Sequence, residues 1–188
     1  MMFDITKAEI AYTAFMKALW LDLNDPSMKD TPRRVSKMFT QETCKGLYMD
    51  FPKITTFPNT NEYWWMVVVK DITVQSICAH HFQNFDGVCH IAYIPKDKII
   101  GLSKFSRIVD YYARRPQTQE FLIKSIFDKL QEILETKDIA ISMNAVHNCM
   151  KVRWVREPNC STSTALVGWI FQHSEATRNE FFNHINNK

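Results

Sequence analysis

The stretch Tyr63–Pro95, YWWMVVVKDITVQSICAHHFQNFDGVCHIAYIP, decides the fold. Its first half, Tyr63–Ile77, is rich in β-branched and aromatic residues, and it predicts one long strand with a bulge or bend near Asp71. The NFDG segment is typical of a turn, and VCHIAYIP predicts a second strand that ends at Pro95. We therefore expect an antiparallel hairpin with CAHHFQNFDG at its connection.

Helices and further strands are predicted on both sides of this hairpin. Apolar residues at helical spacing predict a helix over Ile5–Leu19, and Thr31 followed by Pro32 marks the start of a second helix. Residues 101–136 predict two more helices that are separated near Pro116, with Ser103 capping the first. DIAISMNAV, CMKVRWVRE and TALVGWIFQ predict strands, and SEATRNEFFNHINN predicts a C-terminal helix capped by Ser174.

The order of these elements favours an α+β fold. Strand pairs separated by a helix pair predict a mostly antiparallel sheet with helices packed on one face. We expect the chain to divide into an N-terminal helical segment, residues 1–50, and a second domain, residues 51–188.

The composition is that of an ordinary globular protein. The 188 residues are 46% hydrophobic and 23% charged, and the net charge of +3 is too small to imply a nucleic-acid partner. Five cysteines without regular spacing differ from a secreted disulfide scaffold. No apolar run approaches the roughly 20 residues of a membrane span. We expect a cytoplasmic protein without a membrane or nucleic-acid partner.

A thiol and two imidazoles lie close together in CAHH. Cys78 and His81 supply two possible metal ligands, and Cys149, expected at the start of a later strand, can supply a third if the two strand pairs lie side by side. Three protein ligands with one open position are the arrangement of catalytic zinc. The competing interpretation is ordinary packing, because a single Cys-x-x-His is a weak signal. His80 and His147 are then candidate acids or bases.

Basic residues form the second candidate feature. Lys104 and Arg107 follow Ser103 at a helix start, which would suit a phosphate group, although a solvated surface explains any one of them equally well. Arg153 lies four positions beyond Cys149, and on the expected strand it would share the same face and reach a ligand held at the metal. Glu120 after Gln119 at a helix start is usually a helix-dipole complement, but the pair could also read the donor edge of guanine.

Taken together, the motifs resemble GTP cyclohydrolase I. The resemblance runs from DPSMKDTPRRVSKMF to ATRNEFFNHI, nearly the whole sequence, and rests on DIT, CAHHF, AYIPKD, IGLSKFSRIV, ARRPQTQE and AVHNCMKVR. It implies the tunnelling fold, with two long helices on one face of an antiparallel sheet, and a toroidal homodecamer with active sites between neighbours. It also implies hydrolytic opening of the imidazole ring of GTP, with 7,8-dihydroneopterin triphosphate and formate as products.

The same resemblance implies a role for each candidate residue. Zinc would be bound by Cys78, His81 and Cys149, while His80 and His147 would transfer protons and Ser103 would act at the ribose ring oxygen. Gln119 and Glu120 would read the guanine edge, with Leu102 against the purine face. The triphosphate would be held, partly from different subunits, by Arg34, Lys37, Lys104, Arg107 and Arg153.

Several positions depart from the family pattern. Ala79 replaces a glutamate, Trp154 a glycine and Thr118 a more apolar residue, and CSTSTALVGWIF keeps only Gly168 of a Gly-Gly pair. Such departures are those of a divergent lineage, for example a viral one acting in a host cytoplasm. They leave two alternatives open: a cyclohydrolase that prefers another guanine nucleotide such as dGTP, and a catalytically silent tunnelling-fold subunit that binds a nucleotide or a partner. The downstream pathway, whether folate, tetrahydropterin or 7-deazaguanine synthesis, also stays open.

Overall fold

The computed structural model describes residues 3–186, and the chain divides into two compact units, Met1–Asp50 and Phe51–Lys188. The first unit is helical. It contains α1 (Ile5–Ala18), α2 (Thr31–Lys37), a π-helical segment (Met38–Thr43) and a short 3-10 helix (Lys45–Leu47).

Local signals explain where these helices begin. The Asp4 carboxylate accepts a hydrogen bond from the Lys7 backbone N–H at 3.0 Å, which caps α1. Thr31 is the first residue of α2 rather than its cap, and Pro32 occupies the first turn, where its missing N–H costs no hydrogen bond. On α1 the apolar side chain of Met16 is buried and that of Phe15 is exposed, and Leu19, just after the helix, is also exposed.

The second unit is built on a five-stranded sheet in the order β5-β2-β3-β6-β7. The long strands are β2 (Val67–Cys78), β3 (Asn84–Tyr93) and β6 (Ile139–His147), and the outer strands are β5 (Pro116–Gln117) and β7 (Thr162–Val167). All neighbours are antiparallel except β2 and β5. A separate antiparallel pair joins β1 (Thr56–Pro58) to β4 (Lys98–Ile100).

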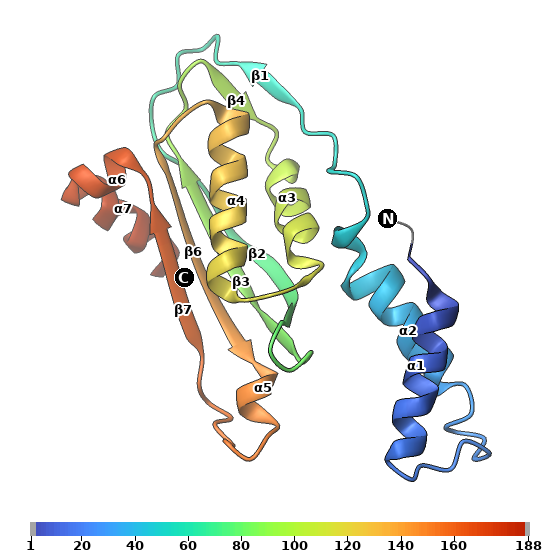
Figure 1. Cartoon of the computed structure of the whole chain (residues 1–188). Helices are drawn as coiled ribbons and strands as arrows, with labels where there is room; N and C mark the ends of the chain where they lie inside the picture. Colours follow the sequence, from blue (N-terminus) through green and yellow to red (C-terminus); the bar gives the residue numbers. More distant parts are fainter. Residues whose placement is uncertain (1–2, 187–188) are drawn as a thin grey trace. The chain divides into compact units, whose positions relative to one another are not determined.

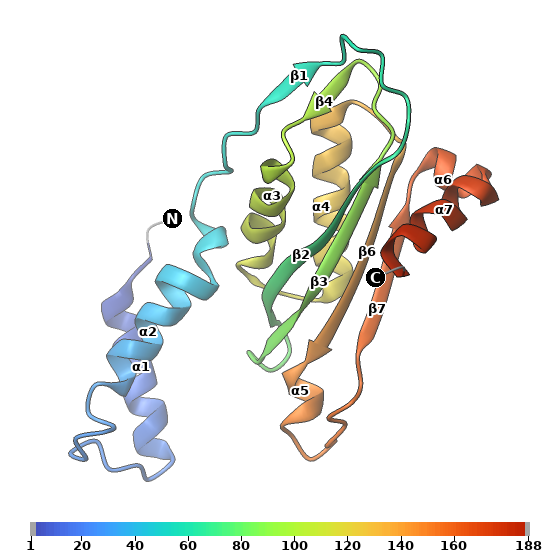
Figure 2. The same cartoon turned by 180° about the vertical axis from the view of Figure 1, so that it is seen from behind.

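Helices cover both faces of this sheet. The two long helices, α3 (Ser103–Ala113) and α4 (Gln119–Leu134), lie side by side on one face (Figure 1). The shorter α6 (Trp169–His173) and α7 (Glu175–Asn186) pack on the opposite face (Figure 2), where Phe171 and Phe181 form a small core with Ala92 and Ala140. The predicted α+β fold, with two long helices on one face, is confirmed.

The predicted irregularity at Asp71 is a β-bulge. Val69 pairs with Ile91 and Ile72 pairs with Cys89, so two residues of β2 oppose His90 alone. Asp71 has a φ of 57°, and its backbone N–H donates to His90 Nδ1 at 3.2 Å. The extra residue keeps the side chains of Val69 and Ile72 on the same face of the sheet, although they are three positions apart.

Four further local predictions were wrong. Ser103 does not cap α3: it is the first residue of the helix, and Leu102 occupies the cap position without a side-chain hydrogen bond. NFDG is not a turn but the start of β3, because Asn84 pairs with Ile77 and Gly87 pairs with Val74. CMKVRWVRE is not a strand: it forms the short helix α5 (Asn148–Lys151) followed by a loop. The segment TALVGWIFQ is strand only as far as Val167 and then becomes α6. In the part of the chain that is described, no helix is long and apolar enough to cross a membrane.

Candidate metal centre

One end of the sheet collects the candidate ligands. The β2–β3 connection is a tight turn in which the Phe82 N–H donates to the Cys78 carbonyl at 2.9 Å and the Cys78 N–H donates to the Gln83 carbonyl at 2.8 Å. Phe82 has a φ of 53°, a left-handed conformation that a side chain larger than glycine adopts at some cost and that often marks a functional site. This turn places Cys78 and His81 at the same end as the last residue of β6.

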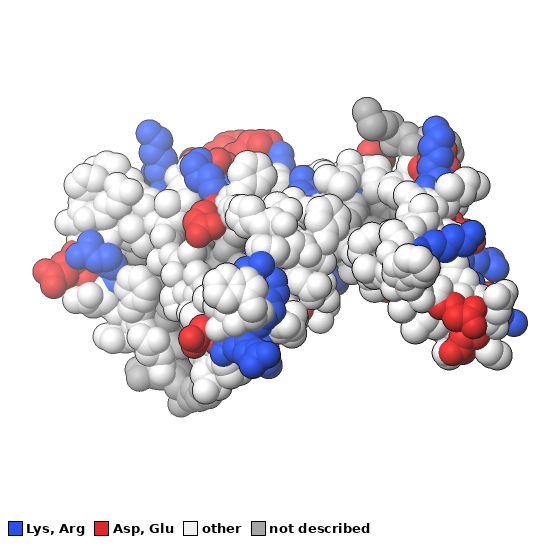
Figure 3. Space-filling view, turned by 60° about the horizontal axis from the view of Figure 1, so that its bottom comes forward, with Lys and Arg blue, Asp and Glu red and all other residues white. Residues whose placement is uncertain are grey.

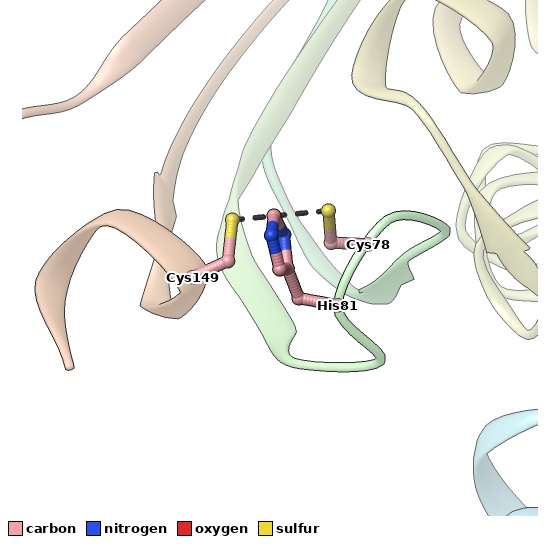
Figure 4. Close-up of side chains that lie close together, drawn as sticks. All are labelled: Cys78, His81 and Cys149. Atoms are coloured by element: carbon pink, nitrogen blue, oxygen red, sulfur yellow. Dashed lines mark hydrogen bonds between the residues drawn. The ribbon is translucent and has the colours of Figure 1, made fainter. Parts of the chain in front are cut away.

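The third ligand arrives from β6. His147 pairs with Phe85 at the end of the β3–β6 ladder, and the chain then leaves the sheet in α5, which carries Cys149. Figure 4 shows Cys149 facing Cys78 and His81 from the other side of the cluster. The sequence prediction that two strand connections meet at one end of the sheet is realised here by a short helix instead of a strand.

The geometry of these three residues fits a tetrahedral zinc ion. Their ligand atoms all lie within 4.8 Å of one another, and the two sulfurs, of Cys78 and Cys149, are 3.7 Å apart. Two sulfurs bound at about 2.3 Å to a tetrahedral zinc ion would be about 3.8 Å apart. Both cysteines are free thiols and buried, whereas His81 is exposed, so the cluster opens toward solvent on the histidine side.

The electrostatics of the two thiols also favour a cation. Burial raises the pKa of the Cys149 thiol, and the neighbouring Cys78 adds to this rise, while the Arg153 guanidinium opposes it. The Cys149 sulfur is therefore poorly ionised by the protein alone. A divalent ion bound between the two cysteines would supply positive charge that favours thiolate ligands.

Two further histidines lie beside the cluster. His80 is exposed, and its Nδ1 is 3.8 Å from the Cys78 sulfur. The His147 ring stacks on Phe85, with 4.6 Å between ring centroids and 13° between planes, and its Nε2 is 2.9 Å from Gln119 Oε1. Burial lowers the pKa of His147, and the carboxylate of Glu120 acts in the opposite direction.

The start of α4 brings the candidate guanine contacts to the same end. The Thr118 hydroxyl accepts from the Phe121 N–H at 3.2 Å and caps the helix. The next two residues then differ sharply: the Glu120 side chain is exposed, but Gln119 is only 1% exposed and its carboxamide is directed into the protein.

Basic side chains gather near the same end. Arg153 lies in the loop after α5, not on a strand, and its Nε donates to the Cys149 carbonyl at 2.8 Å. The contact keeps the guanidinium next to a candidate ligand, although the strand argument for it was wrong. Lys151 and Arg156 are exposed in the same segment, and Figure 3, which turns this end forward, shows Lys and Arg side chains grouped there.

Four other candidate residues of the second unit lie at or near the beginning of α3, at the opposite end of that helix from this cluster. The C-terminal end of α3 leads into β5, where Gln117 pairs with Cys78, so this end lies at the metal cluster. Because α3 has 11 residues and is about 16 Å long, Ser103 and Lys104 lie about that far away, with Arg107 one turn closer. Leu102 is 61% exposed beside them. Arg34 and Lys37 belong to α2 in the other unit, and both are exposed.

Sequence reasoning missed Phe85, which contacts His147, and Thr164, which contacts Gln119. Phe85 lies in the segment that was interpreted as a turn, and it becomes a stacking partner only through the β3–β6 register. Thr164, on β7, holds the Gln119 carboxamide at 3.0 Å. The alternation of TSTALV could have indicated a strand, but no local signal joins it to α4.

Comparisons with known proteins agree with this picture. The family profile described as GTP cyclohydrolase I matches residues 8–186. The protein named GTP cyclohydrolase 1 of Yersinia enterocolitica is 47% identical over 177 residues, which are 94% of this chain and 80% of the relative. The proteins of that name from Edwardsiella ictaluri and Enterobacter sp. are 47% and 48% identical, covering 95% and 90% of this chain and 82% and 77% of the relatives. The resemblance in sequence and the observed fold, which is consistent with the tunnelling fold, thus converge: the chain belongs to the GTP cyclohydrolase I family of hydrolases.

Proposed function

We propose that this chain converts GTP and water to 7,8-dihydroneopterin triphosphate and formate, with zinc bound by Cys78, His81 and Cys149. The observation that carries the proposal is the convergence of these three ligand atoms within 4.8 Å at one end of the sheet. The exposed Glu120 and the ring of His147 lie at the same end, so a purine next to the metal would meet both.

The protein's own groups have separable tasks at this site. Zinc would supply Lewis acidity, which lowers the pKa of a bound water to about 7. His80 and His147 would move protons, and the proximity of His80 to the Cys78 sulfur supports protonation of the purine N7 by His80. The Glu120 carboxylate would accept from the ring N–H and the exocyclic amine of guanine in a bidentate way.

The triphosphate contacts support an active site shared between subunits. Leu102, Ser103 and Lys104 lie at the start of α3, about 16 Å from the metal end of their own chain, so Leu102 and Ser103 could not contact a purine or ribose held there. In a homo-oligomer, the toroidal decamer that the resemblance implies, they would meet the metal centre of a neighbour. There they would join Arg107, Arg153, Arg34 and Lys37 around the phosphates.

Surface features support such an assembly. The helix α1 exposes Ile10 and Phe15, and after it Leu19 is exposed and Trp20 is 95% exposed. Within the described sheet, β7 pairs only with β6, and its outer edge offers hydrogen-bonding groups to another chain. The free thiols of all five cysteines accord with a reducing cytoplasm as the site of the reaction.

A direct assay tests the reaction. Purified protein loaded with zinc is incubated with GTP or dGTP, and formate release and the fluorescence of the oxidised pterin are followed. We expect both products, with GTP preferred. Formate without pterin would contradict the ring-closure step. The absence of both products from a folded, zinc-loaded protein would contradict the proposed function and favour a silent nucleotide-binding subunit.

A further inference from the structure

The carboxamide of Gln119 has a fixed orientation. Its Nε2 lies 3.1 Å from the Met143 carbonyl and 3.1 Å from the Thr162 carbonyl, and 3.0 Å from the Thr164 hydroxyl. Backbone carbonyls only accept hydrogen bonds, so the NH₂ group, and not the oxygen, must face them. The reversed amide would place its oxygen against two carbonyl oxygens. The side chain is 1% exposed, so water could not relieve that repulsion.

This orientation determines the hydrogen position on His147. The amide oxygen Oε1 is turned toward His147 Nε2, at 2.9 Å. An amide oxygen cannot donate, so Nε2 must carry the hydrogen, and the neutral ring then has its lone pair on Nδ1. Among residues 3–186, Nδ1 has no hydrogen-bond partner, and the ring plane is set by stacking on Phe85.

We propose that Gln119 is a positioning residue, which fixes His147 in the Nε2–H tautomer and so presents Nδ1 to the substrate. The inference rests on the proposed cyclohydrolase function and changes the role that resemblance gave to Gln119. To contact guanine, its carboxamide would have to give up four internal contacts. The buried carbonyls that it now contacts would then lose a hydrogen-bond donor. The donor edge of the base is therefore read by Glu120, the exposed neighbour.

The support for this carboxamide comes from the segment that departs most from the family pattern. Thr162 and Thr164 belong to β7, inside CSTSTALVGWIF, and Met143 belongs to β6. The altered sequence thus still provides the contacts that orient Gln119. A series of hydrogen bonds thus connects β7 with Gln119 at the start of α4, and Gln119 with the His147 ring at the end of β6.

Two variants separate positioning from base recognition. In Gln119→Met, which keeps the length of the side chain without its polar groups, we expect kcat for GTP to fall about 100-fold with KM changed less than about threefold. In Glu120→Gln we expect KM to rise and the preference for GTP over inosine triphosphate, which lacks the 2-amino group, to collapse. A raised KM and a lost preference in Gln119→Met would overturn the proposal, because they would make Gln119 a base contact.

A spectroscopic readout tests the tautomer independently of turnover. The zinc-loaded full chain is labelled with ¹⁵N-histidine, and the His147 signals are assigned from their loss in His147→Gln. We expect Nε2–H in the wild type and mixed tautomers in Gln119→Met. An Nδ1–H ring in the wild type, or an unchanged Nε2–H ring in Gln119→Met, would overturn the proposal.

A second variant, Thr164→Val, distinguishes a loss of folding from a loss of positioning. If Gln119→Met does not fold, Thr164→Val removes only the hydroxyl partner of the carboxamide, and we expect it to lower kcat by a smaller factor with the same constant KM. An unchanged kcat in folded, zinc-loaded Thr164→Val, together with an unchanged tautomer, would also contradict the proposal. A wild type without activity would reject the cyclohydrolase function, whereas the tautomer measurement would still decide the role of Gln119.

Discussion

The two ends of α3 belong to different kinds of surface. At the C-terminal end, where β2 and β6 finish, side chains from β2, the following turn, β6, α4 and α5 converge on one cluster, and most of them are buried or hydrogen-bonded. At the N-terminal end, Leu102, Ser103 and Arg107 are exposed. The C-terminal end is organised within a single chain, whereas the exposed N-terminal end has the features of a surface that binds a partner.

The difference separates two tasks of one active site. Metal binding and proton transfer need positions fixed to within a fraction of an ångström, which packing inside one chain supplies. Charge contacts to a flexible triphosphate tolerate more freedom, and they can be contributed by another chain.

The largest effect is expected from loss of a ligand. Cys149→Ala should abolish zinc binding and product formation, because two remaining ligands cannot hold the ion in a catalytic geometry. Metal analysis after dialysis and the pterin assay measure the two effects. The matched control is Cys160→Ser, a half-exposed thiol in the loop after α5, which should keep both zinc and activity. Full zinc occupancy in Cys149→Ala would contradict the assignment of Cys149 as a metal ligand.

Mixing two inactive variants tests whether the ends of α3 serve different sites. Cys149→Ala lacks a metal ligand, and the double variant Lys104→Ala with Arg107→Ala lacks phosphate contacts. If each site combines the metal end of one chain with the α3 N-terminus of another, co-assembly at equal amounts should restore about a quarter of the sites. Activity is compared before and after co-assembly. A mixture no more active than the average of its parents would place both sets of residues in one chain.

A smaller loss is expected at the guanine contact. Glu120→Gln replaces a charged acceptor by a neutral amide, and kcat/KM for GTP should fall about 10- to 100-fold, the range of a charge-assisted hydrogen bond. Steady-state kinetics measure it, with Glu132→Gln, an exposed glutamate of α4 paired with Lys129, as the control. An equal fall of kcat/KM in both variants would contradict a guanine contact at Glu120, because a general change of charge on α4 would then explain the loss.

The smallest effect concerns the bulge that keeps β2 in register. Burial lowers the pKa of His90, with Lys70 acting in the same direction and Asp71 against it. The unfolded chain, with an ordinary histidine pKa of about 6.5, therefore binds a proton first as the pH falls. Stability should be full above about pH 6.5 and decline below it. His90→Asn, which keeps an acceptor for the Asp71 N–H without a titrating ring, should show a flatter profile.

Urea unfolding of wild type and His90→Asn at several pH values measures this difference, with zinc saturated in both. The difference between the two profiles isolates His90 from the carboxylates and the other histidines. A wild-type stability that rises relative to His90→Asn as the pH falls would contradict a buried neutral ring at the bulge.

The sequence predicted what local patterns control. Helical spacing located α1, α3 and α4, β-branched and aromatic residues located β2, and the bulge or bend expected near Asp71 is a bulge. The spacing of CAHH and the later Cys149 predicted a cluster, and the structure brings its three ligand atoms within 4.8 Å.

Misleading patterns explain the failures. Val152 and Trp154 alternate with basic residues as in a half-buried strand, but they are 63% and 82% exposed, so no core stabilises a strand there. Gly87 made NFDG resemble a turn. In the structure a side chain at this glycine would have its Cβ 1.9 Å from the Asn144 carbonyl oxygen, so the residue permits close approach of β3 to β6.

The environment of Gln119 was inaccessible for a different reason. Its partners lie on three strand positions that are 24, 43 and 45 residues away along the chain. Such contacts follow from sheet order and register, which no local pattern encodes. The residue types at the metal end were therefore predictable, whereas their mutual orientation was not.

The most direct test of the account is X-ray absorption at the zinc edge of the zinc-loaded protein. We predict two sulfur ligands at about 2.3 Å, one histidine nitrogen at about 2.0 Å and one light atom from solvent. In Cys149→Ala this spectrum should be lost. A first shell with a different number of sulfurs, or with a fourth protein ligand that closes the site, would contradict the open Cys78, His81 and Cys149 centre.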